Sequence, residues 1–297
     1  MNKFKYISLI LMTTFLMGIA FPVGKLGMSY APPFFLMGIR FVLAGGLLAI
    51  IVARRPRPHG VKQWLQAAVI GLFQSAGVMG CAYYSMRWIT SGESSIITCT
   101  NPLLVIVLGT LLTGASYRGR QWLGVGVGFV GVLFTFGLHM SIEPGTFISF
   151  AGALCFASAT LLIKRWGPAF DMTVLAAYQM IAGGIGLFLL SSFTEHPYFI
   201  FSGTSVIIVL WLAVMGSIVQ FSVWFYLLRN GDPARTSAFL FLVPLFGVIS
   251  SWLLLGEKVQ WEVGVGGAFI CVGIFLVNWE GKAKAKARIR KGPALEG

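Results

Sequence analysis

The chain has 297 residues, of which 57% are hydrophobic and only 10% are charged, and its mean hydropathy is +0.84. Such a composition leaves too few polar side chains to cover a soluble globule of this length, so it excludes the water-soluble classes of enzyme and binding domain. The formal net charge of +13 comes from lysines and arginines beside apolar runs. This pattern reflects membrane topology and is no argument for nucleic-acid binding.

Apolar runs long enough to cross a bilayer as helices, about 20 residues each, recur along the whole chain. None of them alternates polar and apolar residues as the strands of a membrane barrel do. In chain order, the predicted helices are 5–24, 33–53, 64–86, 93–113, 121–138, 146–163, 171–191, 205–228, 235–255 and 262–280. A helix satisfies its own backbone hydrogen bonds in lipid. The sequence therefore predicts an all-α integral membrane protein with ten transmembrane helices.

The second half of the chain repeats the first with weak identity but in a long gapless register. The stretch 84–131 aligns with 226–273, and we call this alignment the late register. Each half then contains five of the predicted helices. The predicted units are a first repeat at 1–140, a second repeat at 145–280 and a basic tail at 281–297.

The first predicted helix also has features of a secretory signal peptide, because Lys3 and Lys5 precede an apolar run. A weak cleavage site is present at Gly18-Ile19-Ala20. However, this helix belongs to the duplication, because a second alignment, the early register, places Lys25 on Lys164 and the first helix on 146–163, deep inside the chain. We expect it to be retained as a helix.

Lysine and arginine placement predicts the orientation of the helices. With the N-terminus in the cytoplasm, 18 of the 22 lysines and arginines fall on the inside, whereas Lys25, Arg87 and Lys258 fall on the outside. Both termini are then cytoplasmic, in a multi-pass protein of the cell membrane (plasma or inner membrane). The basic stretch 282–291 either touches anionic lipid or acts as a solvated anchor on the inside.

Five is an odd number, so the second repeat must enter the membrane in the opposite orientation to the first. The loop charges agree, because Arg54 and Arg55 follow the second helix, whereas the corresponding loop after the seventh carries Glu195 and no lysine or arginine. Many secondary transporters are inverted repeats of this kind, in which two similar bundles rock about a site near the midplane. The predicted architecture of two inverted five-helix repeats thus favours transport by alternating access.

Several segments resemble a known family. The run Trp224–Pro244, followed by Trp252–Glu257, resembles the second EamA repeat of the drug/metabolite transporter superfamily. Its first-half counterpart runs from Tyr84 through Asn101-Pro102 to Gly114, and the segment 31–41 resembles the start of the family's second helix.

This resemblance covers about residues 5–280. It implies a ten-helix carrier of small metabolites, commonly an exporter of amino acids or related compounds. One position departs from the family pattern: the glutamate often found just after the fourth helix is Ala115 here, while Glu257 is kept in the second copy. A role for a symmetric pair of carboxylates is therefore in doubt.

Arg40 stands out because it lies inside the second predicted helix, roughly 10 Å from the outer end. A charged side chain at such a depth is costly unless it faces a cavity or another helix. It is either a structural anchor, snorkelling or binding a backbone carbonyl of a neighbouring helix, or a group that attracts an anionic part of the cargo. Its partner in the other half is Gln179, so any charge-based recognition must be asymmetric.

Asn101-Pro102 interrupts the fourth predicted helix, and Pro244 repeats the interruption in the second half. A proline frees a backbone carbonyl about one turn earlier, and the asparagine can hydrogen-bond there. Paired interruptions point to a binding site at the midplane of a transporter. The alternative is a pair of kinks that only shape the bundle.

The remaining candidates are amide, hydroxyl and aromatic side chains within the spans. Gln220 and Trp224 are four residues apart and share one helical face, which suits stacking on, and hydrogen bonds to, a partly apolar metabolite. Tyrosine and tryptophan also populate the membrane interfaces, so the structural alternative stays open. The predicted substrate-binding residues are Arg40, Gln74, Tyr83, Asn101, Ser158, Gln179, Gln220 and Trp224, with Pro102 and Pro244 as helix-break or gating residues.

No cofactor, metal or catalytic site is predicted. The four cysteines lie in apolar spans at spacings unlike a metal site, and the three histidines lie in connecting segments. A glycine pattern at 126–131 lies inside a predicted span, where Gly124 and Gly128 indicate close helix packing. All nine carboxylates lie at span ends, in loops or in the tail. Facilitated diffusion is therefore credible, while proton antiport through Glu93 or a tyrosine–arginine arrangement stays open.

The sequence as a whole predicts a membrane transporter that exports small organic metabolites, such as amino acids or related compounds, by alternating access. Its predicted partners are a small-molecule substrate and the lipid bilayer, with no nucleic acid; monomer and homodimer both stay open. The alternative is a protein that is no transporter, either an intramembrane enzyme or a receptor-like sensor. An enzyme needs clustered acids, histidines or serine–lysine dyads inside the spans, and a sensor needs a soluble output domain; neither is evident.

Overall fold

A computed structural model describes residues 3–114, 116–135, 143–230, 239–258 and 261–278. Within these ranges every regular element is a helix. The elements are α1 (Lys3–Gly27), α2 (Pro33–Ile51), α3 (Gly60–Gly71), η1 (Leu72–Gly77), α4 (Val78–Ser85), α5 (Ser91–Thr98), α6 (Asn101–Thr113), α7 (Gly119–Thr135), α8 (Pro144–Trp166), η2 (Gly167–Ala169), α9 (Met172–Thr194), α10 (Gly203–Ala213), η3 (Val214–Val219), α11 (Gln220–Asn230), η4 (Phe239–Phe241), α13 (Leu242–Leu255) and α14 (Trp261–Asn278).

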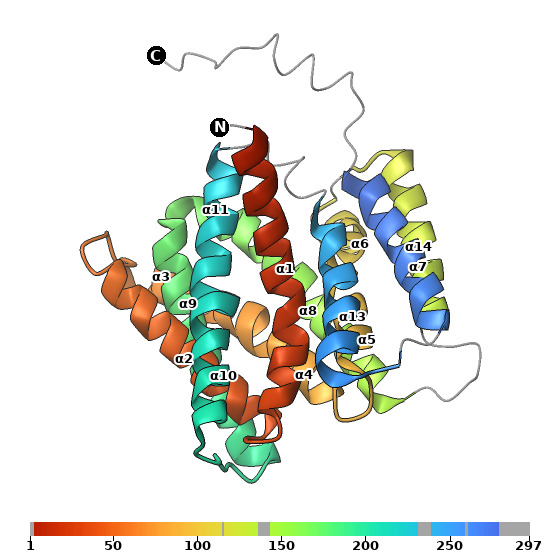
Figure 1. The fold of residues 1–297 in the computed structure, drawn as a ribbon. Helices are drawn as coiled ribbons and strands as arrows, with labels where there is room; N and C mark the ends of the chain where they lie inside the picture. The colour runs from red at the N-terminus through yellow and green to blue at the C-terminus, as the bar shows by residue number, and fades with distance from the viewer. Residues whose placement is uncertain (1–2, 115, 136–142, 231–238, 259–260, 279–297) are drawn as a thin grey trace, which may run out of the picture.

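The helical elements reproduce the predicted spans. Seven of the described helices are long and apolar enough to cross a membrane, and α13 and α14 are two shorter apolar ones. Together with α7 they occupy the ten predicted positions, so the predicted all-α membrane fold is confirmed. Figure 1 shows α1 beginning and α14 ending at the same end of the bundle. We call this end proximal and the opposite end distal. The predicted boundary between the two repeats falls mainly on residues outside the described ranges, and the predicted tail at 281–297 lies wholly outside them.

Helices α7 and α14, which occupy equivalent places in the two halves, cross at glycines. A Cβ atom on Gly124 would lie 2.7 Å from the carbonyl oxygen of Gly273, and one on Gly131 would lie 2.5 Å from that of Gly266. The late register maps each of these two contacts onto the other. Because the residue number rises along α7 from the first contact to the second and falls along α14, the two helices are antiparallel. Figure 1 shows this pair lying side by side. Equivalent helices that run antiparallel are what an inverted repeat requires.

Helices α2 and α9 show the same relation in the early register. A Cβ atom on Gly45 would lie 2.8 Å from the carbonyl oxygen of Ala177, and one on Gly184 would lie 3.1 Å from that of Gly38. Small residues let helix backbones approach this closely in membranes, where lipid supplies no hydrophobic drive for association. Two separate glycine crossings therefore join the halves.

The third and eighth spans each contain a π-helical segment that the apolar pattern did not predict. Residues 72–77 form η1 within the third span, and residues 214–219 form η3 within the eighth. The two segments coincide when the late register is continued toward the N-terminus. A π-helical turn widens the helix and is frequent at functional sites. The paired positions show that the duplication extends to local backbone geometry.

Asp171 begins α9 by accepting hydrogen bonds from the backbone N–H groups of Thr173 (2.9 Å) and Val174 (3.2 Å), and it pairs with Arg55 at 3.0 Å. Although burial acts to raise its pKa, these hydrogen bonds and Arg55 outweigh burial and lower it. A lowered pKa means that the stabilisation is present above the unfolded-state pKa and is lost as pH falls through the folded-state value.

We expect Asp171→Ala to lower the stability of the protein by about 1 kcal/mol at neutral pH, because the N-cap is lost. The melting temperature in detergent measures this effect. Asp171→Asn is the matched control: asparagine also caps helices well, and the exposed pair with Arg55 contributes little. Equal losses for both variants would show that the ion pair, and not the cap, stabilises this end of α9.

Candidate functional site

Arg40 lies in the middle of α2, is 2% exposed, and has its guanidinium group hydrogen-bonded within the protein. Nη2 donates to the carbonyl oxygen of Gly216 at 2.7 Å, Nε donates to Oγ of Ser217 at 3.1 Å, and Nη1 lies 3.5 Å from the hydroxyl of Tyr83. Gly216 and Ser217 belong to η3, in the other half of the chain. Arg40 thus joins α2 to the π-helical segment of the eighth span.

Gln179 makes the corresponding contact in the other direction. It lies in α9, is 4% exposed, and accepts a hydrogen bond from Oγ of Ser75 at 2.9 Å. Ser75 belongs to η1 and corresponds to Ser217 in the continued late register, just as Arg40 corresponds to Gln179 in the early register. The two contacts are therefore related by the internal symmetry. We call them the two π-segment pins.

Tyr83 is completely buried, and its hydroxyl donates to the carbonyl oxygen of Ala20 in α1. Its ring stacks on that of Phe21, with 6.3 Å between centroids. Any side chain at Gly24 would run into the Tyr83 ring, so this residue must stay small. The side chains of Arg40, Tyr83 and Gln179 each form hydrogen bonds inside the protein, Gln179 through its amide oxygen, a geometry that favours the structural alternative for these three predicted residues.

Among the described residues, no hydrogen-bond partner exists for the side chains of Gln74, Asn101, Ser158, Gln220 and Trp224. Asn101 is only 9% exposed and Gln220 only 6%. Burying an unpaired amide is costly, so these side chains are suited to partners that come from outside the chain, such as water or cargo.

The position of Gln220 is fixed by its backbone. It is the first residue of α11, directly after η3, and its carbonyl oxygen accepts a hydrogen bond from the hydroxyl of Thr13 in α1 at 3.2 Å. Trp224 follows one turn later and is half-buried. The predicted face of Gln220 and Trp224 thus lies on the helix that continues the second π-helical segment.

The interruption predicted at Asn101-Pro102 lies where α5 ends at Thr98 and α6 begins at Asn101, with Pro102 in its first turn. Pro244 likewise lies in the first turn of α13, which follows the short helix η4. Each proline starts a new helix here, where its missing N–H costs nothing. The hydroxyl of Thr98, beside the first interruption, is the one fully enclosed side-chain polar atom without a partner in the described part of the chain.

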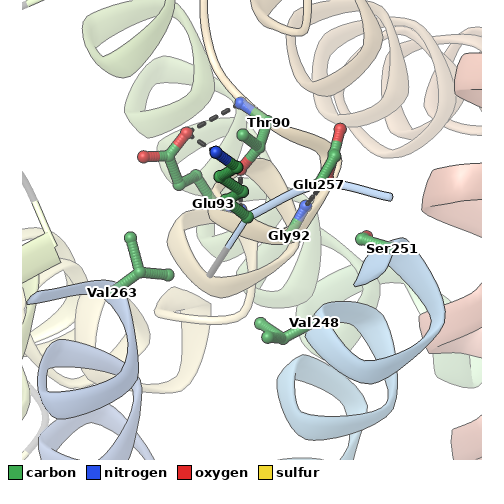
Figure 2. A pocket seen from close by; sticks show the side chains of 8 residues that line it. Thr90, Gly92, Glu93, Val248, Ser251, Glu257 and Val263 are labelled. Atoms are coloured by element: carbon green, nitrogen blue, oxygen red, sulfur yellow. Dashed lines mark hydrogen bonds between the residues drawn. The ribbon is translucent and has the colours of Figure 1, made fainter. Parts of the chain in front are cut away.

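The sequence did not single out a polar network at the distal end. Glu257 and Glu195, both of the second half, contact helix N-termini of the first half and form ion pairs with Lys25 and Arg87. Figure 2 shows Glu257 beside the first turn of α5. A cavity of about 30 Å³ lies there and is also lined by Glu93 and Ser251. The sequence marked Glu257 as the carboxylate kept in the second copy and Glu195 as a loop charge, but it did not predict their contacts with α5 and α2. Their contacts depend on how the two halves meet.

The remaining ionisable groups of the described residues do not gather into a cluster. Within the described ranges, no three histidine, cysteine, aspartate or glutamate side chains lie close enough together to hold an ion. The four cysteines are free thiols.

Comparison with known proteins relates this architecture to membrane transport. The model of the EamA-like transporter family matches residues 4–137 and again residues 143–279. A relative in Bacillus subtilis, the uncharacterized transporter YvbV, is 29% identical over 281 residues, which cover 92% of this chain and 91% of that protein. The uncharacterized inner membrane transporter YedA of Escherichia coli is 28% identical, with 82% of each chain covered.

Two further matches extend this likeness. A WAT1-related chloroplastic protein of Arabidopsis thaliana is 28% identical over 89% of this chain and 67% of its own length. A solved crystal structure superposes with a TM-score of 0.65 over 91% of this chain and 97% of that chain, at 17% identity. At this identity the structural likeness shows the fold alone. The sequence relatives support a membrane transporter, and their names specify no substrate.

Proposed function

Because the chain belongs to the EamA-like transporter family, we propose that it exports small organic metabolites, such as amino acids or related compounds, by alternating access. The observation that carries this proposal is the contrast between used and unused polar groups. The two π-segment pins use their polar groups within the protein, whereas the nearly buried amides of Asn101 and Gln220 have no partner among the described residues. Unpaired amides beside helix interruptions are suited to binding a polar cargo.

The two inverted halves supply the moving parts of this mechanism. Their antiparallel contacts at α2–α9 and α7–α14 relate the halves by a two-fold axis, about which one half can rock against the other. The charge distribution supports placing both termini in the cytoplasm and the distal end outside the cell membrane. Cargo would then bind from the proximal side and leave at the distal side.

Cargo recognition in this proposal relies on neutral groups. The amides of Gln74, Asn101 and Gln220 and the hydroxyl of Ser158 can donate or accept hydrogen bonds, and Trp224 offers an aromatic face. Such a set suits a small solute with polar and apolar parts. We place Arg40 outside the recognition set, because its donors already serve Gly216 and Ser217.

The proposal is tested by overproducing the protein in cells and profiling the metabolites that they excrete. The compounds that accumulate outside are then loaded, in labelled form, into liposomes that contain the purified protein. Export is expected to be saturable and to exceed that of protein-free liposomes. A sealed and folded preparation that moves no compound from a wide metabolite panel would contradict the proposal.

Gln220→Leu is expected to lower kcat/KM for the cargo about tenfold, the effect of losing one hydrogen bond to a ligand. The melting temperature should stay near that of the parent protein, because the Gln220 side chain has no hydrogen bond within the described protein. Gln179→Leu is the matched control and should lower the melting temperature, since it leaves Ser75 without its partner. If Gln220→Leu destabilises the protein as much as Gln179→Leu, Gln220 is a structural residue.

A further inference from the structure

Glu257 binds the N-terminus of α5 at the distal end of the bundle. Its carboxylate accepts hydrogen bonds from the backbone N–H of Ser91 at 3.0 and 3.1 Å, from Oγ of Ser91 at 2.9 Å and from the N–H of Gly92 at 3.4 Å. Nζ of Lys25 lies 2.9 Å from the same carboxylate and also donates to the carbonyl oxygen of Ile89 at 3.2 Å. A residue of the second half thus satisfies donors on two helices of the first half.

Glu195 does the same at the N-terminus of α2. It accepts hydrogen bonds from the backbone N–H groups of Phe34 at 3.3 Å and Phe35 at 3.4 Å, and from Oγ of Ser191 at 3.0 Å. Nη2 of Arg87 lies 3.3 Å away, and the Glu195 side chain is 1% exposed. Both carboxylates therefore meet a helix N-terminus, where the positive end of the helix dipole favours negative charge. Each also meets one cation.

Below Glu257, beside this cavity, α5 contacts α13 directly. Oγ of Ser91 lies 2.8 Å from Oγ of Ser251, and a Cβ atom on Gly92 would lie 3.5 Å from Val248. Farther down, Gly247 lies so close to Ser95 that it has no room for a side chain. The contacts between the fourth and ninth spans thus include a closed seam at their distal ends, while α6 packs against α7 and α8.

The chain has no carboxylates at the corresponding positions of the proximal end. In the late register Glu257 corresponds to Ala115, which lies outside the described residues, and in the early register Glu195 corresponds to Pro56. The cation is kept, since Lys25 corresponds to Lys164. The internal symmetry is therefore broken where the acidic groups stand.

We propose that the Lys25–Glu257 and Arg87–Glu195 pairs, with the helix N-termini that they cover, are the distal gate of the carrier. This inference rests on the proposed function, because a gate has a role only in a protein that opens alternately to its two sides. Cargo leaves distally when Glu257 and Glu195 release α5 and α2. Among the described residues, the comparable contact at the proximal end is the Arg55–Asp171 pair, whose side chains are more exposed than those of either distal pair. The empty carrier therefore rests with its distal end shut.

The gate is tested by a reversible cross-link across the seam. In a background without the four native cysteines, Ser91→Cys and Ser251→Cys are combined, and disulfide formation is followed by mass spectrometry. Oxidation should abolish transport, and a reductant should restore it. Ser85→Cys with Ser94→Cys is the matched control: their hydroxyls lie 3.3 Å apart, but both belong to the first half. That cross-link should leave transport intact.

The outcomes separate the gate from the proposed function. If the Ser91–Ser251 disulfide forms and the oxidised protein transports as fast as the reduced one, the gate is wrong while transport stands. Failure of the two cysteines to cross-link would also overturn the gate, because the seam would not be closed. Loss of transport in the reduced protein and in the parent protein would instead count against the proposed function.

A second measurement tests the gate without any transport assay. Ser95 is completely buried below the seam, so Ser95→Cys in the cysteine-free background reports opening through its reaction with a membrane-impermeant maleimide added outside. Glu257→Ala should raise the labelling rate at least severalfold. Glu93→Ala is the matched control, because Glu93 lines the same cavity but, among the described residues, hydrogen-bonds only to Thr90 in its own turn. Equal labelling rates in the two variants would refute the gate.

Discussion

Replacing Arg40 with glutamine is expected to lower the melting temperature of the purified protein and to slow the transport of anionic, zwitterionic and neutral cargo to the same degree. The short hydrogen bonds from Arg40 to Gly216 and Ser217 cross from one half to the other. Hydrogen bonds to a charged group contribute about 1.5–3 kcal/mol each, so the loss should reach about 3 kcal/mol. Thermal unfolding in detergent and uptake of three cargo classes measure the two effects.

Ser217→Ala is the graded control for this prediction. It removes one acceptor of Arg40 and keeps both the positive charge and the bond to Gly216. Its melting temperature should therefore lie between those of the parent protein and Arg40→Gln. The contrary result is a normal melting temperature for Arg40→Gln together with a selective loss of anionic cargo. It would assign Arg40 to cargo recognition and remove it from the π-segment pins.

The sequence predicted the helical spans well because hydrophobic length is a property of each segment by itself. Two local features agree with the predicted positions: Asp171, where the seventh predicted helix begins, caps α9, and α6 begins at the predicted interruption Asn101-Pro102. The π-helical segments were missed, because their residues are as apolar as those of an ordinary span. They are recognisable only through their backbone and through the carbonyl of Gly216 that bonds Arg40.

The sequence could not distinguish the predicted site residues that have hydrogen-bond partners within the protein from those that have none. Arg40, Gln179 and Gln220 were equally plausible as polar residues in lipid, and only the tertiary pairing shows that the first two have protein partners. The distal gate was missed for the same reason. Glu257 and Lys25 are 232 positions apart, and counting loop charges for topology gives no hint that they meet.

Features that repeat in both halves and features found in only one half have different physical roles. The glycine crossings and the π-segment pins repeat in both halves, because they hold one half against the other. The unpaired Asn101 corresponds to Val243, and Glu257 corresponds to Ala115. The residues that differ between the halves are thus those proposed to bind cargo and to close one end. A carrier whose halves were identical would have no means of favouring one side.

A large side chain at the crossing of α7 and α14 is expected to destabilise the protein strongly. In Gly124→Leu, the new side chain would start 2.7 Å from the carbonyl oxygen of Gly273 and 2.9 Å from the side chain of Val277. Backbone atoms cannot move aside as a flexible side chain does, so the helices must separate. We expect a loss of about 3 kcal/mol, at the upper end for overpacked sites, and a lower melting temperature in detergent.

Gly126→Leu is the matched control, two residues away on the same helix. No atom lies within 4 Å of the position of its Cβ, and leucine is a better helix former than glycine by several tenths of a kcal/mol. Its melting temperature should equal or exceed that of the parent protein. Equal losses for both leucine variants would show that α7 and α14 do not cross at Gly124. If Gly124→Leu stays folded and yet fails to transport, the crossing changes during the cycle and is itself one of the moving contacts.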